Sequence, residues 1–464
     1  MVGEFASWNV GSMYASNFGD YLPNRHMPGT STLSTADKAS QEGVAGHTGP
    51  EDPARLEKGD VLVAGSLAVD LSCDYAPFAN ESIKVTPVPH TSNPAVIGQS
   101  LGGVGHNVAI ASNYLGGSTL FCSIVGDDLT GPAALSALQE EGISTAGIQI
   151  LPTSSGARTA QYVAVNDANK DLLVAMAGMG IMELPEHELD FDGFWEPMMQ
   201  RTKPQWVVVD ANWRPEVIAK WATLAKKHGA RVAFEPVSTA KSCRLFNNGS
   251  GEKAAIGPLD SVPNNTISLA APNKLELAAM HMAMREGGHV DSSGWWRIID
   301  AMGMPSSGAR DRLAAMTSPN LVDEGIPQQS IQLLPFIPCI ITKLGEQGVL
   351  LTQLLRPGDP RLVSADSAPY IVSHASPGQD LIGGVYMRLF PPARVLPQDD
   401  IVSVNGAGDT MLGAIITGLA KGTQKHVEDI IPVAQEASVK TLKSAGGVSR
   451  DIAGLRKKLE AASC

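Results

Sequence analysis

The chain has 464 residues, of which 43% are hydrophobic, so it can form one large α/β domain or two to three smaller ones. Its net charge of −12 argues against a general nucleic-acid binder, which carries a basic surface stripe. Five scattered cysteines without a C-x-x-C pair predict reduced thiols in an intracellular, cytoplasmic protein and no cysteine metal site, and no apolar run approaches the length of a membrane span.

The first 58 residues form a distinct segment. They are rich in Ser, Gly, Thr, Asn and Pro and show no sustained hydrophobic period, so we expect a flexible leader. The segment lacks the basic and apolar regions of a secretory signal. Arg25 is the one clear cation among the first thirty residues, which fits a transit peptide poorly and leaves organellar targeting open. We expect the folded domain to span residues 59–464.

Short apolar runs alternate with amphipathic stretches from residue 61 onward. The runs predict buried strands at 61–65, 119–126, 206–210, 231–234, 267–271, 339–342, 349–354 and 384–389. Helices are predicted at 108–115, 128–138, 216–228 and 274–285, with one beginning near 406 and two more at the C-terminal end. The alternation indicates an α/β fold with a doubly wound, mostly parallel sheet, helices on both faces and ligands at the carboxyl ends of the strands.

Two parts of the chain depart from this rhythm. Apolar runs at 159–165 and 172–176 are joined by a polar turn and predict a hairpin. Residues 72–100 are irregular, with several Pro and Asn. We expect these parts, roughly 72–100 and 157–180, to form a small β lid. A Pro-rich excursion covers residues 356–399.

Residues 403–410, Ser-Val-Asn-Gly-Ala-Gly-Asp-Thr, run directly into an apolar helical pattern. Gly406, Ala407 and Gly408 allow backbone amides to crowd together at a helix start, where the first N–H groups lack partners and the dipole is positive. Such a terminus binds an anion, most often phosphate. Asp409 in the first turn can accept a proton from an attacking hydroxyl. A glycine-rich helix start with an Asp cap is the equally favoured alternative.

A second glycine-rich run lies earlier, at Gly102 and Gly103, and leads to Asn107. It resembles half of a dinucleotide fingerprint but lacks the third glycine and does not directly follow a predicted strand, so a nicotinamide site is disfavoured. The sequence has no G-x-x-x-x-G-K-[ST] phosphate loop. Asp70 follows the first strand. Taken alone, Asp70 is more simply a solvated acid at a strand end, whereas for the glycine pair a turn and a binding role are equally favoured.

Asn273 and Glu276 follow the strand at 267–271 and begin a helix. Because they are three residues apart, both can face one site at the helix start. They also match a capping box, in which Asn273 caps the helix and Glu276 bonds back to it. The two roles are compatible.

These motifs together resemble the ribokinase-like (PfkB) carbohydrate kinase family. The resemblance covers roughly residues 60–460 and rests on four motifs in order: the Gly-Gly pair with Asn107, Asn273 with Glu276, Gly345 with Gly348, and the late Gly-Ala-Gly-Asp. Within the family, residues 384–388, 395–397 and 403–405 are similar to those of eukaryotic pseudouridine kinases. The similarity extends to the kinase half of fungal proteins that fuse such a kinase to a pseudouridine-5′-phosphate glycosidase; residues 1–58 are too short for a glycosidase half.

The resemblance implies roles for individual residues. Asp409 would be the general base, and Gly406, Ala407 and Gly408 the anion hole for the transferred phosphoryl group. The sugar hydroxyls would be held by Asp70, Gly102, Gly103 and Asn107.

On the nucleotide side, the resemblance implies that Asn273 and Glu276 organise water and Mg²⁺ beside the phosphates, with Glu276 reaching the metal through water. Thr342, Gly345 and Gly348 would line the nucleotide.

Two departures from the family pattern stand out. Ser403-Val404 replaces an Asp-Thr pair that often helps to form a monovalent-cation site, which leaves potassium activation open. Lys343 is an extra residue within the usual Thr-Leu-Gly segment.

The activity implied by the resemblance is Mg²⁺- and ATP-dependent phosphorylation of a sugar or nucleoside hydroxyl, with pseudouridine and its 5′-hydroxyl as the first choice. Adenosine kinase and ribokinase are the alternatives among enzymes, and a non-catalytic nucleotide- or sugar-binding protein is the alternative of another class. The expected partners are ATP and the small substrate, with no nucleic acid and no membrane. The resemblance also implies a lid through which two copies can form a homodimer.

Overall fold

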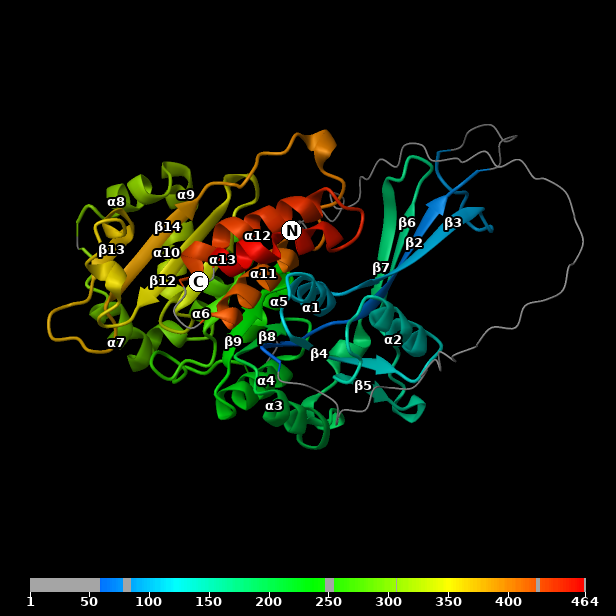
Figure 1. Ribbon diagram of the computed structural model, residues 1–464, viewed down its shortest axis with the longest axis horizontal. Coiled ribbons are helices and arrows are strands. Elements are labelled where there is room, and N and C mark those ends of the chain that lie inside the picture. The colour runs from blue at the N-terminus through cyan, green and yellow to red at the C-terminus, as the bar shows by residue number, and fades with distance from the viewer. Residues whose placement is uncertain (1–58, 78–84, 247–253, 306, 423–425, 463–464) are drawn as a thin grey trace, which may run out of the picture.

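The computed structural model describes residues 59–462 apart from 78–84, 247–253, 306 and 423–425. The leader expected at residues 1–58 therefore lies outside the described residues. Two sheets organise the remainder, one of ten strands and one of four (Figure 1). Within the described residues, no helix is both long enough and apolar enough to cross a membrane.

The ten-stranded sheet has the order β13-β14-β12-β11-β10-β9-β8-β1-β4-β5. From β5 to β11 every pairing is parallel, and β11, β12, β14 and β13 pair antiparallel at the far edge. The strands are short apolar runs, most of them buried on both faces, as expected for a sheet covered by helices. Their bounds are β1 Val61–Ala64, β4 Thr119–Gly126, β5 Ile148–Leu151, β8 Trp206–Asp210, β9 Arg231–Glu235, β10 Leu269–Ala270, β11 Cys339–Lys343, β12 Val349–Leu355, β13 Ile371–His374 and β14 Gly384–Phe390.

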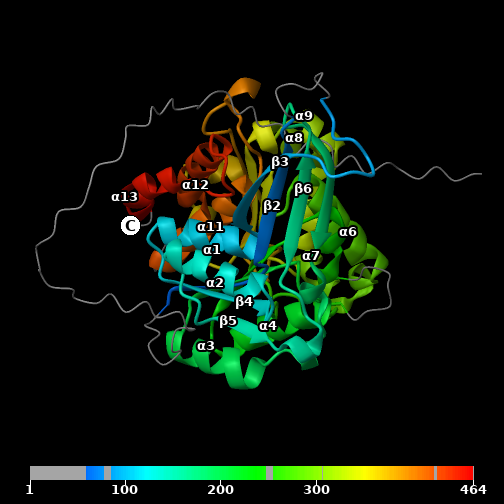
Figure 2. The same ribbon diagram turned by 90° about the vertical axis from the view of Figure 1, so that its right-hand side faces the viewer.

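Helices cover both faces of this sheet, so the expected doubly wound α/β architecture is confirmed (Figure 2). One face packs against α1 Val104–Tyr114, α2 Thr130–Glu140, α11 Ala407–Lys421, α12 Val427–Leu442 and α13 Arg456–Ala462. The other face packs against α3 Glu196–Thr202, α4 Pro215–Lys227, α6 Lys274–Glu286, α7 Ser293–Ala301, α8 Ala309–Met316, α9 Pro319–Asp323 and α10 Ile326–Leu333. A short helix, α5 Thr239–Ser242, follows β9 and packs beside α6.

The four-stranded sheet stands apart from the helical layers, at the right of Figure 1. Its order is β3-β2-β6-β7, with β2 Ala68–Tyr75, β3 Ala95–Gly102, β6 Gln161–Asn166 and β7 Leu172–Gly178. Both segments expected to form a β lid contribute strands to it, so we call it the lid sheet. Only residues 65–67 separate β1 in the main sheet from β2 in the lid sheet. Any movement of the lid sheet relative to the main sheet would therefore pivot near the carboxyl end of β1.

The structure corrects the sequence expectation in several places. Residues 72–100 are not irregular throughout, because β2 and β3 occupy both ends of the segment. Polar residues alternate along β2, and β3 is almost wholly exposed, so neither strand carries an apolar run. The strands β5 and β13 were not expected, and β10 has two residues in place of the five expected.

Candidate active site

The start of α11 lies at the carboxyl edge of the main sheet. Gly406 precedes the helix with φ 69°, and a Cβ on Gly406 would lie 1.7 Å from the carbonyl oxygen of Gly447. A side chain is excluded at this position by both conformation and space. The amides of Ala407 and Gly408 then open the helix without intrahelical acceptors. This arrangement provides the positive helix terminus that the sequence predicted for residues 406–409.

Asp409 sits in the first turn of α11 with 8% of its surface exposed. The side-chain amide of Asn107 donates a hydrogen bond to Asp409 Oδ2 at 2.8 Å. Burial raises the pKa of Asp409 to about 6, against the opposing effects of the Asn107 hydrogen bond and the Lys343 charge. The nearby carboxylates of Asp210 and Glu276 raise it further. Near neutral pH Asp409 is thus ionised but more basic than an exposed aspartate, which suits a general base.

Asp70 and Gly102 form a close contact between the strands β2 and β3. An ideal Cβ on Gly102 would lie 2.2 Å from Asp70 Oδ2, so only glycine leaves this carboxylate in place. Gly103 follows with φ 101° and begins α1, the helix that carries Asn107. Burial raises the pKa of Asp70 to about 6, while the charge of His106 lowers it. The four predicted sugar-binding residues therefore belong to one junction between the lid sheet and α1.

Asn273 and Glu276 form the capping box that the sequence allowed. Asn273 Oδ1 accepts hydrogen bonds from the amides of Leu275 and Glu276, both at 2.9 Å, and Glu276 Oε2 accepts one from the amide of Asn273 at 2.8 Å. Glu276 is buried, and its charge acts on both Asp409 and Lys343. The cap thus holds a carboxylate within electrostatic range of the start of α11.

The end of β11 and the turn that joins it to β12 carry the three other predicted residues. Thr342 is fully buried, and strand alternation directs its side chain to the face of β11 opposite that of Lys343. Gly345 has φ 62°, and a Cβ there would meet open space. Gly348 has φ 91°, and a Cβ there would lie 2.0 Å from the carbonyl oxygen of Phe390. Gly348 is therefore required by the turn itself, whereas Gly345 leaves room for a ligand.

Sequence reasoning gave no role to the ion pair between Lys343 and Glu235. Lys343 Nζ lies 3.0 Å from Glu235 Oε1 and 3.2 Å from Oε2. An ideal Cβ on Gly408 would lie 3.1 Å from the same nitrogen. The pair therefore borders the start of α11. Its sequence signal was a lysine and a glutamate, each at the end of a buried strand.

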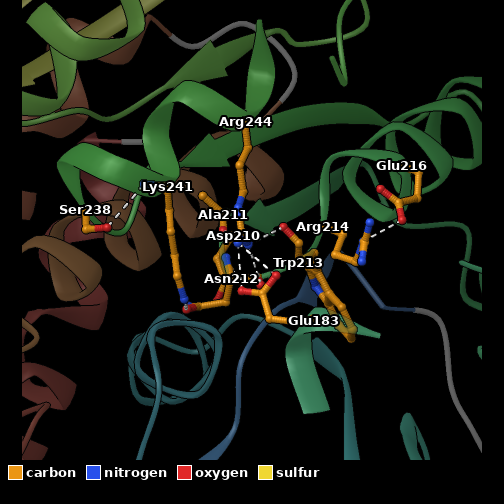
Figure 3. A network of polar contacts seen from close by, with 10 residues as sticks. All are labelled: Glu183, Asp210, Ala211, Asn212, Trp213, Arg214, Glu216, Ser238, Lys241 and Arg244. Atoms are coloured by element: carbon orange, nitrogen blue, oxygen red, sulfur yellow. Dashed lines mark hydrogen bonds and ion pairs between the residues drawn. The ribbon is translucent and has the colours of Figure 1, made fainter. Parts of the chain in front are cut away.

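A second group that sequence reasoning missed surrounds Asp210 at the end of β8 (Figure 3). Asp210 Oδ2 accepts hydrogen bonds from the amide and hydroxyl of Ser66 at 2.8 and 3.0 Å, and Asn212 donates to the same carboxylate. Lys241 donates to Asn212 Oδ1 at 2.7 Å, and Arg244 donates to the carbonyls of Ala211, Asn212 and Trp213. This network fixes the segment after β8.

Ser66 extends that network to the lid. Its hydroxyl accepts a hydrogen bond from the amide of Val104, and its carbonyl accepts one from the amide of His106. Ser66 lies between β1 and β2, and Val104 begins α1. The Asp210 network therefore anchors both the connection to the lid sheet and the helix that carries Asn107. The short motif Val-Asp-Ala-Asn at residues 209–212 was the only available sequence signal.

The donor set around Asp409 fits a magnesium ion that is held mainly by phosphates and water. Within the described residues, no group of three or more His, Cys, Asp or Glu side chains forms a metal cluster. Glu276 and Glu235 are buried carboxylates, and Glu276 Oε1 makes no hydrogen bond to the described part of the chain. Mg²⁺ commonly binds through one or two carboxylates together with substrate phosphates, and Glu276 can supply one of them. Both oxygens of Glu235 already accept hydrogen bonds from Lys343.

Comparisons with known proteins identify relatives of the chain. The pattern of the family described as pfkB family carbohydrate kinase matches residues 59–248 and 362–452. The unmatched segment between them supplies β10, β11 and β12 to the same sheet.

Among individual proteins, the chain is 28% identical over 425 residues to a pseudouridine-metabolizing bifunctional protein of Schizosaccharomyces pombe, covering 90% of this chain and 51% of that protein. It is 29% identical over 189 residues to the pseudouridine kinase of Escherichia coli, covering 41% of this chain and 55% of that one. The chain thus spans about half the length of these curated relatives. Arabidopsis thaliana ribokinase, solved with ribose and ATP, has a TM-score of 0.51 at 17% identity, covering 87% of this chain and 98% of that one.

Proposed function

Because the chain belongs to the pfkB family of carbohydrate kinases, we propose that it transfers the terminal phosphoryl group of ATP to a hydroxyl of a sugar or nucleoside, most specifically to the 5′-hydroxyl of pseudouridine. The observation that carries the proposal is the placement of Asp409. A buried carboxylate with a raised pKa lies in the first turn of a helix whose opening amides are free to hold phosphate. A general base and an anion hole in one helical turn can accept the hydroxyl proton and stabilise the transferred phosphoryl group.

The reaction proceeds in one displacement. The acceptor oxygen forms a bond to the terminal phosphorus as the bond from that phosphorus to the bridging oxygen of ADP breaks, and the hydroxyl proton passes to Asp409. Asn107 holds the Asp409 carboxylate in the required orientation through its 2.8 Å hydrogen bond. The amides of Ala407 and Gly408 stabilise the charge that develops on the transferred group.

The junction of β2, β3 and α1 holds the acceptor. A carboxylate such as Asp70 accepts hydrogen bonds from two vicinal hydroxyls, and Gly102 lets the sugar approach the backbone closely. Gly103 and Asn107 complete this side of the site. Because Asn107 also bonds to Asp409, binding of the sugar and placement of the base are mechanically coupled.

The opposite side holds ATP and Mg²⁺. Gly345 leaves open space at the β11–β12 turn, and Glu276 lies within electrostatic range of Asp409. When bound, the metal would neutralise charge on the phosphates, with Glu276 as its protein ligand or as an acceptor for one of its waters. Asn273 holds Glu276 in place through the capping box. The roles of Thr342 and Gly348 along the nucleotide stay predictions.

The lid sheet closes over the acceptor in this proposal and excludes water during transfer. Its connection to the main sheet through residues 65–67 lies at the carboxyl edge, where the other site residues gather. We also propose that the lid sheet joins two copies of the chain.

Pseudouridine is favoured over other acceptors by the two relatives whose names specify it. The test is ADP formation with ATP and Mg²⁺ against pseudouridine, uridine, adenosine, ribose and fructose 6-phosphate. Turnover with pseudouridine alone supports the full proposal. Turnover with adenosine or ribose retains the kinase and replaces the acceptor. ATP binding without turnover of any acceptor points to a non-catalytic nucleotide- or sugar-binding protein.

A further inference from the structure

Lys343 lies at the last position of β11, where the main sheet meets the start of α11. Its amide donates to the carbonyl of Pro272 at 2.8 Å, and it pairs with Asn273 in an isolated parallel bridge. These backbone contacts fix Lys343 beside the capping box. Its side chain extends toward Gly408, where an ideal Cβ would lie 3.1 Å from the lysine nitrogen. The ammonium group therefore lies against the first turn of α11, close enough that a side chain on Gly408 would press on it.

The surroundings of the ammonium group are strongly acidic. Burial alone would lower the pKa of Lys343, but the carboxylates of Glu235, Glu276 and Asp409 raise it above its ordinary value. Lys343 therefore stays protonated and is not a base. It is the cation that acts on both Glu235 and Asp409. A triphosphate entering this group of carboxylates needs positive charge, and Lys343 places such a charge beside the opening amides of α11.

The ion pair with Glu235 leaves the ammonium group able to reach a ligand. The side chain of Glu235 is 3% exposed, whereas that of Lys343 is 16% exposed, so the lysine is the partner that faces outward. Within the described residues, its hydrogen bonds go only to the two Glu235 oxygens, and an ammonium group has three donors. A buried ion pair is by itself weak evidence of a stabilising role, because desolvation offsets most of the attraction.

We infer that the Lys343 ammonium group contacts the phosphoryl group that is transferred and stabilises the charge on its oxygens, with Glu235 as the residue that positions it. The inference rests on the proposed phosphoryl transfer and adds a side-chain cation to an anion hole otherwise built from backbone amides. Lys343 transfers no proton and forms no bond to phosphorus. Its contribution is the fixed charge of a preorganised donor, which is larger in a buried site than in water.

The test compares two variants that share one background. Lys343→Met alone would leave the Glu235 carboxylate buried without its partner and could unfold the protein. The informative comparison is therefore Glu235→Gln against Glu235→Gln/Lys343→Met, with folding of both checked by thermal melting. Lys227→Met is the matched control, because Lys227 also pairs with a glutamate, Glu196, but on the exposed side of α4. We expect this control to retain wild-type kcat.

Two measurements report on the inference. Removing Lys343 in the Glu235→Gln background should lower kcat by about 10²- to 10³-fold and change the KM for the acceptor by less than about threefold. In calorimetric titrations with Mg²⁺ and no acceptor, affinity for ATP should fall by about tenfold and affinity for ADP by less than about threefold, because ADP lacks the contacted group. Equal losses for ATP and ADP, or a kcat within about threefold of the background, would overturn the inference.

The nucleotide titrations separate this inference from the proposed function. If the wild-type chain phosphorylates no acceptor, the proposed function fails, yet a loss of affinity confined to ATP would still place Lys343 at the terminal phosphate. If the wild type turns over but both nucleotides bind the double variant as tightly as the background, Lys343 has only a structural role.

Discussion

At the scale of single residues, the candidate site contains carboxylates whose burial is energetically unfavourable. Asp409 and Asp70 are carboxylates whose pKa values burial raises to about 6, and among the described residues no arginine or lysine forms an ion pair with either of them. Each is instead flanked by a neutral group or a glycine, namely Asn107 beside Asp409 and Gly102 beside Asp70. Residues in such surroundings are typical of functional sites, because structure alone would favour an apolar or paired side chain.

Replacing Asp409 with Asn tests its role as base and its effect on stability together. We expect kcat to fall by about 10²- to 10⁴-fold, since the substitution removes the carboxylate that takes the proton of the acceptor hydroxyl. The folded-state pKa lies above the unfolded value of 3.8, so ionisation destabilises the folded protein as pH rises through about 4 to 6. At pH 8 the variant should therefore be more stable by up to about 3 kcal/mol in denaturant unfolding. ATP binding should be retained, and a variant with most of its rate would remove Asp409 from the mechanism.

The pH dependence of kcat/KM follows from the same two carboxylates. Both must be ionised, Asp409 to accept a proton and Asp70 to accept hydrogen bonds, and both have a pKa of about 6. Activity should be constant above about pH 7 and should fall below pH 6 by more than tenfold per pH unit. Asp70→Asn should reduce that slope to about tenfold per unit. An acid limb of unchanged slope in Asp70→Asn would show that Asp70 does not titrate in the free enzyme.

Gly102 and Gly98 offer a matched pair on one strand. Gly102→Ala brings a Cβ to 2.2 Å from Asp70 Oδ2 and must displace this carboxylate, whereas Gly98→Ala meets no atom within 4 Å. We expect Gly102→Ala to lower kcat/KM for the acceptor by about 10- to 100-fold with unchanged affinity for ATP. Gly98→Ala should stay within about twofold of the wild type. Steady-state kinetics with both substrates varied make the measurement, and equal effects of the two substitutions would contradict the role given to Gly102.

Contacts between residues close in sequence were predictable at this scale, whereas contacts between distant residues were not. The capping box of Asn273 and Glu276 was predictable because it depends on residues three apart in one helix. The pairing of Lys343 with Glu235 was not, because the two residues are 108 positions apart and meet only once β9 and β11 lie in one sheet. The bond from Asn107 to Asp409 joins positions 302 apart for the same reason.

At the scale of elements, the lid sheet has two different faces. The paired register places Asp70, Ser72 and Asp74 of β2 on one face, beside Tyr162 and Asn166 of β6. The other face is mostly apolar, although Gln99 and Gln161 also belong to it. Its apolar members include Leu71, Cys73, Ile97, Val163, Val165, Val174 and Met176. Because the proposed acceptor site includes Asp70, we expect the polar face to be directed to the substrate. The opposite face is partly exposed, and no helical layer of the described residues lies over it.

An exposed apolar sheet face of this kind favours association with a second copy. We therefore expect the chain to be a dimer, and Ile97→Asp combined with Met176→Asp to yield monomers. Leu129→Asp is the control, because Leu129 is exposed outside the lid sheet and should leave the dimer intact. Sedimentation velocity at micromolar concentration makes the measurement. A wild-type monomer, or a dimer that survives both lid substitutions, would exclude association through the lid sheet.

The elements also show why some strands were predicted and others missed. The strands β1, β4, β8 and β9 are continuous apolar runs, because helices cover both of their faces. The strands β2 and β3 are less buried than these strands on both faces. Their residues therefore follow no simple hydrophobic pattern. The apolar runs from which strands were predicted arise because neighbouring layers bury the strand, and not from strand formation itself.

At the scale of the whole molecule, the candidate site lies where two sheets and two helical layers meet. Its residues come from β2, the end of β3, the start of α1, β9, the start of α6, β11 and the start of α11. The Asp210 network and Ser66 tie the main sheet to the base of the lid sheet at this meeting point. Movement of the lid sheet relative to the main sheet would therefore change the position of Asp70 against a fixed Asp409.

Closure of the lid sheet should be visible in solution. With pseudouridine and a non-hydrolysable ATP analogue both present, we expect the radius of gyration from small-angle X-ray scattering to decrease, since the lid sheet stands apart from the main sheet (Figure 1). Either ligand alone should produce a smaller change. An unchanged radius with both ligands bound would indicate that the lid sheet is already closed or does not move.

The packing of α1 against α11 has a consequence for biosynthesis. The two helices touch along their length, and the Thr417 hydroxyl bonds to that of Ser112 across 305 positions of sequence. While the ribosome has not yet released residues 407–421, the apolar surface of α1 has no cover and Asn107 has no Asp409 to hold. A nascent chain of this protein thus exposes apolar surface between the synthesis of α1 and that of α11, and we expect chaperones to raise its folding yield.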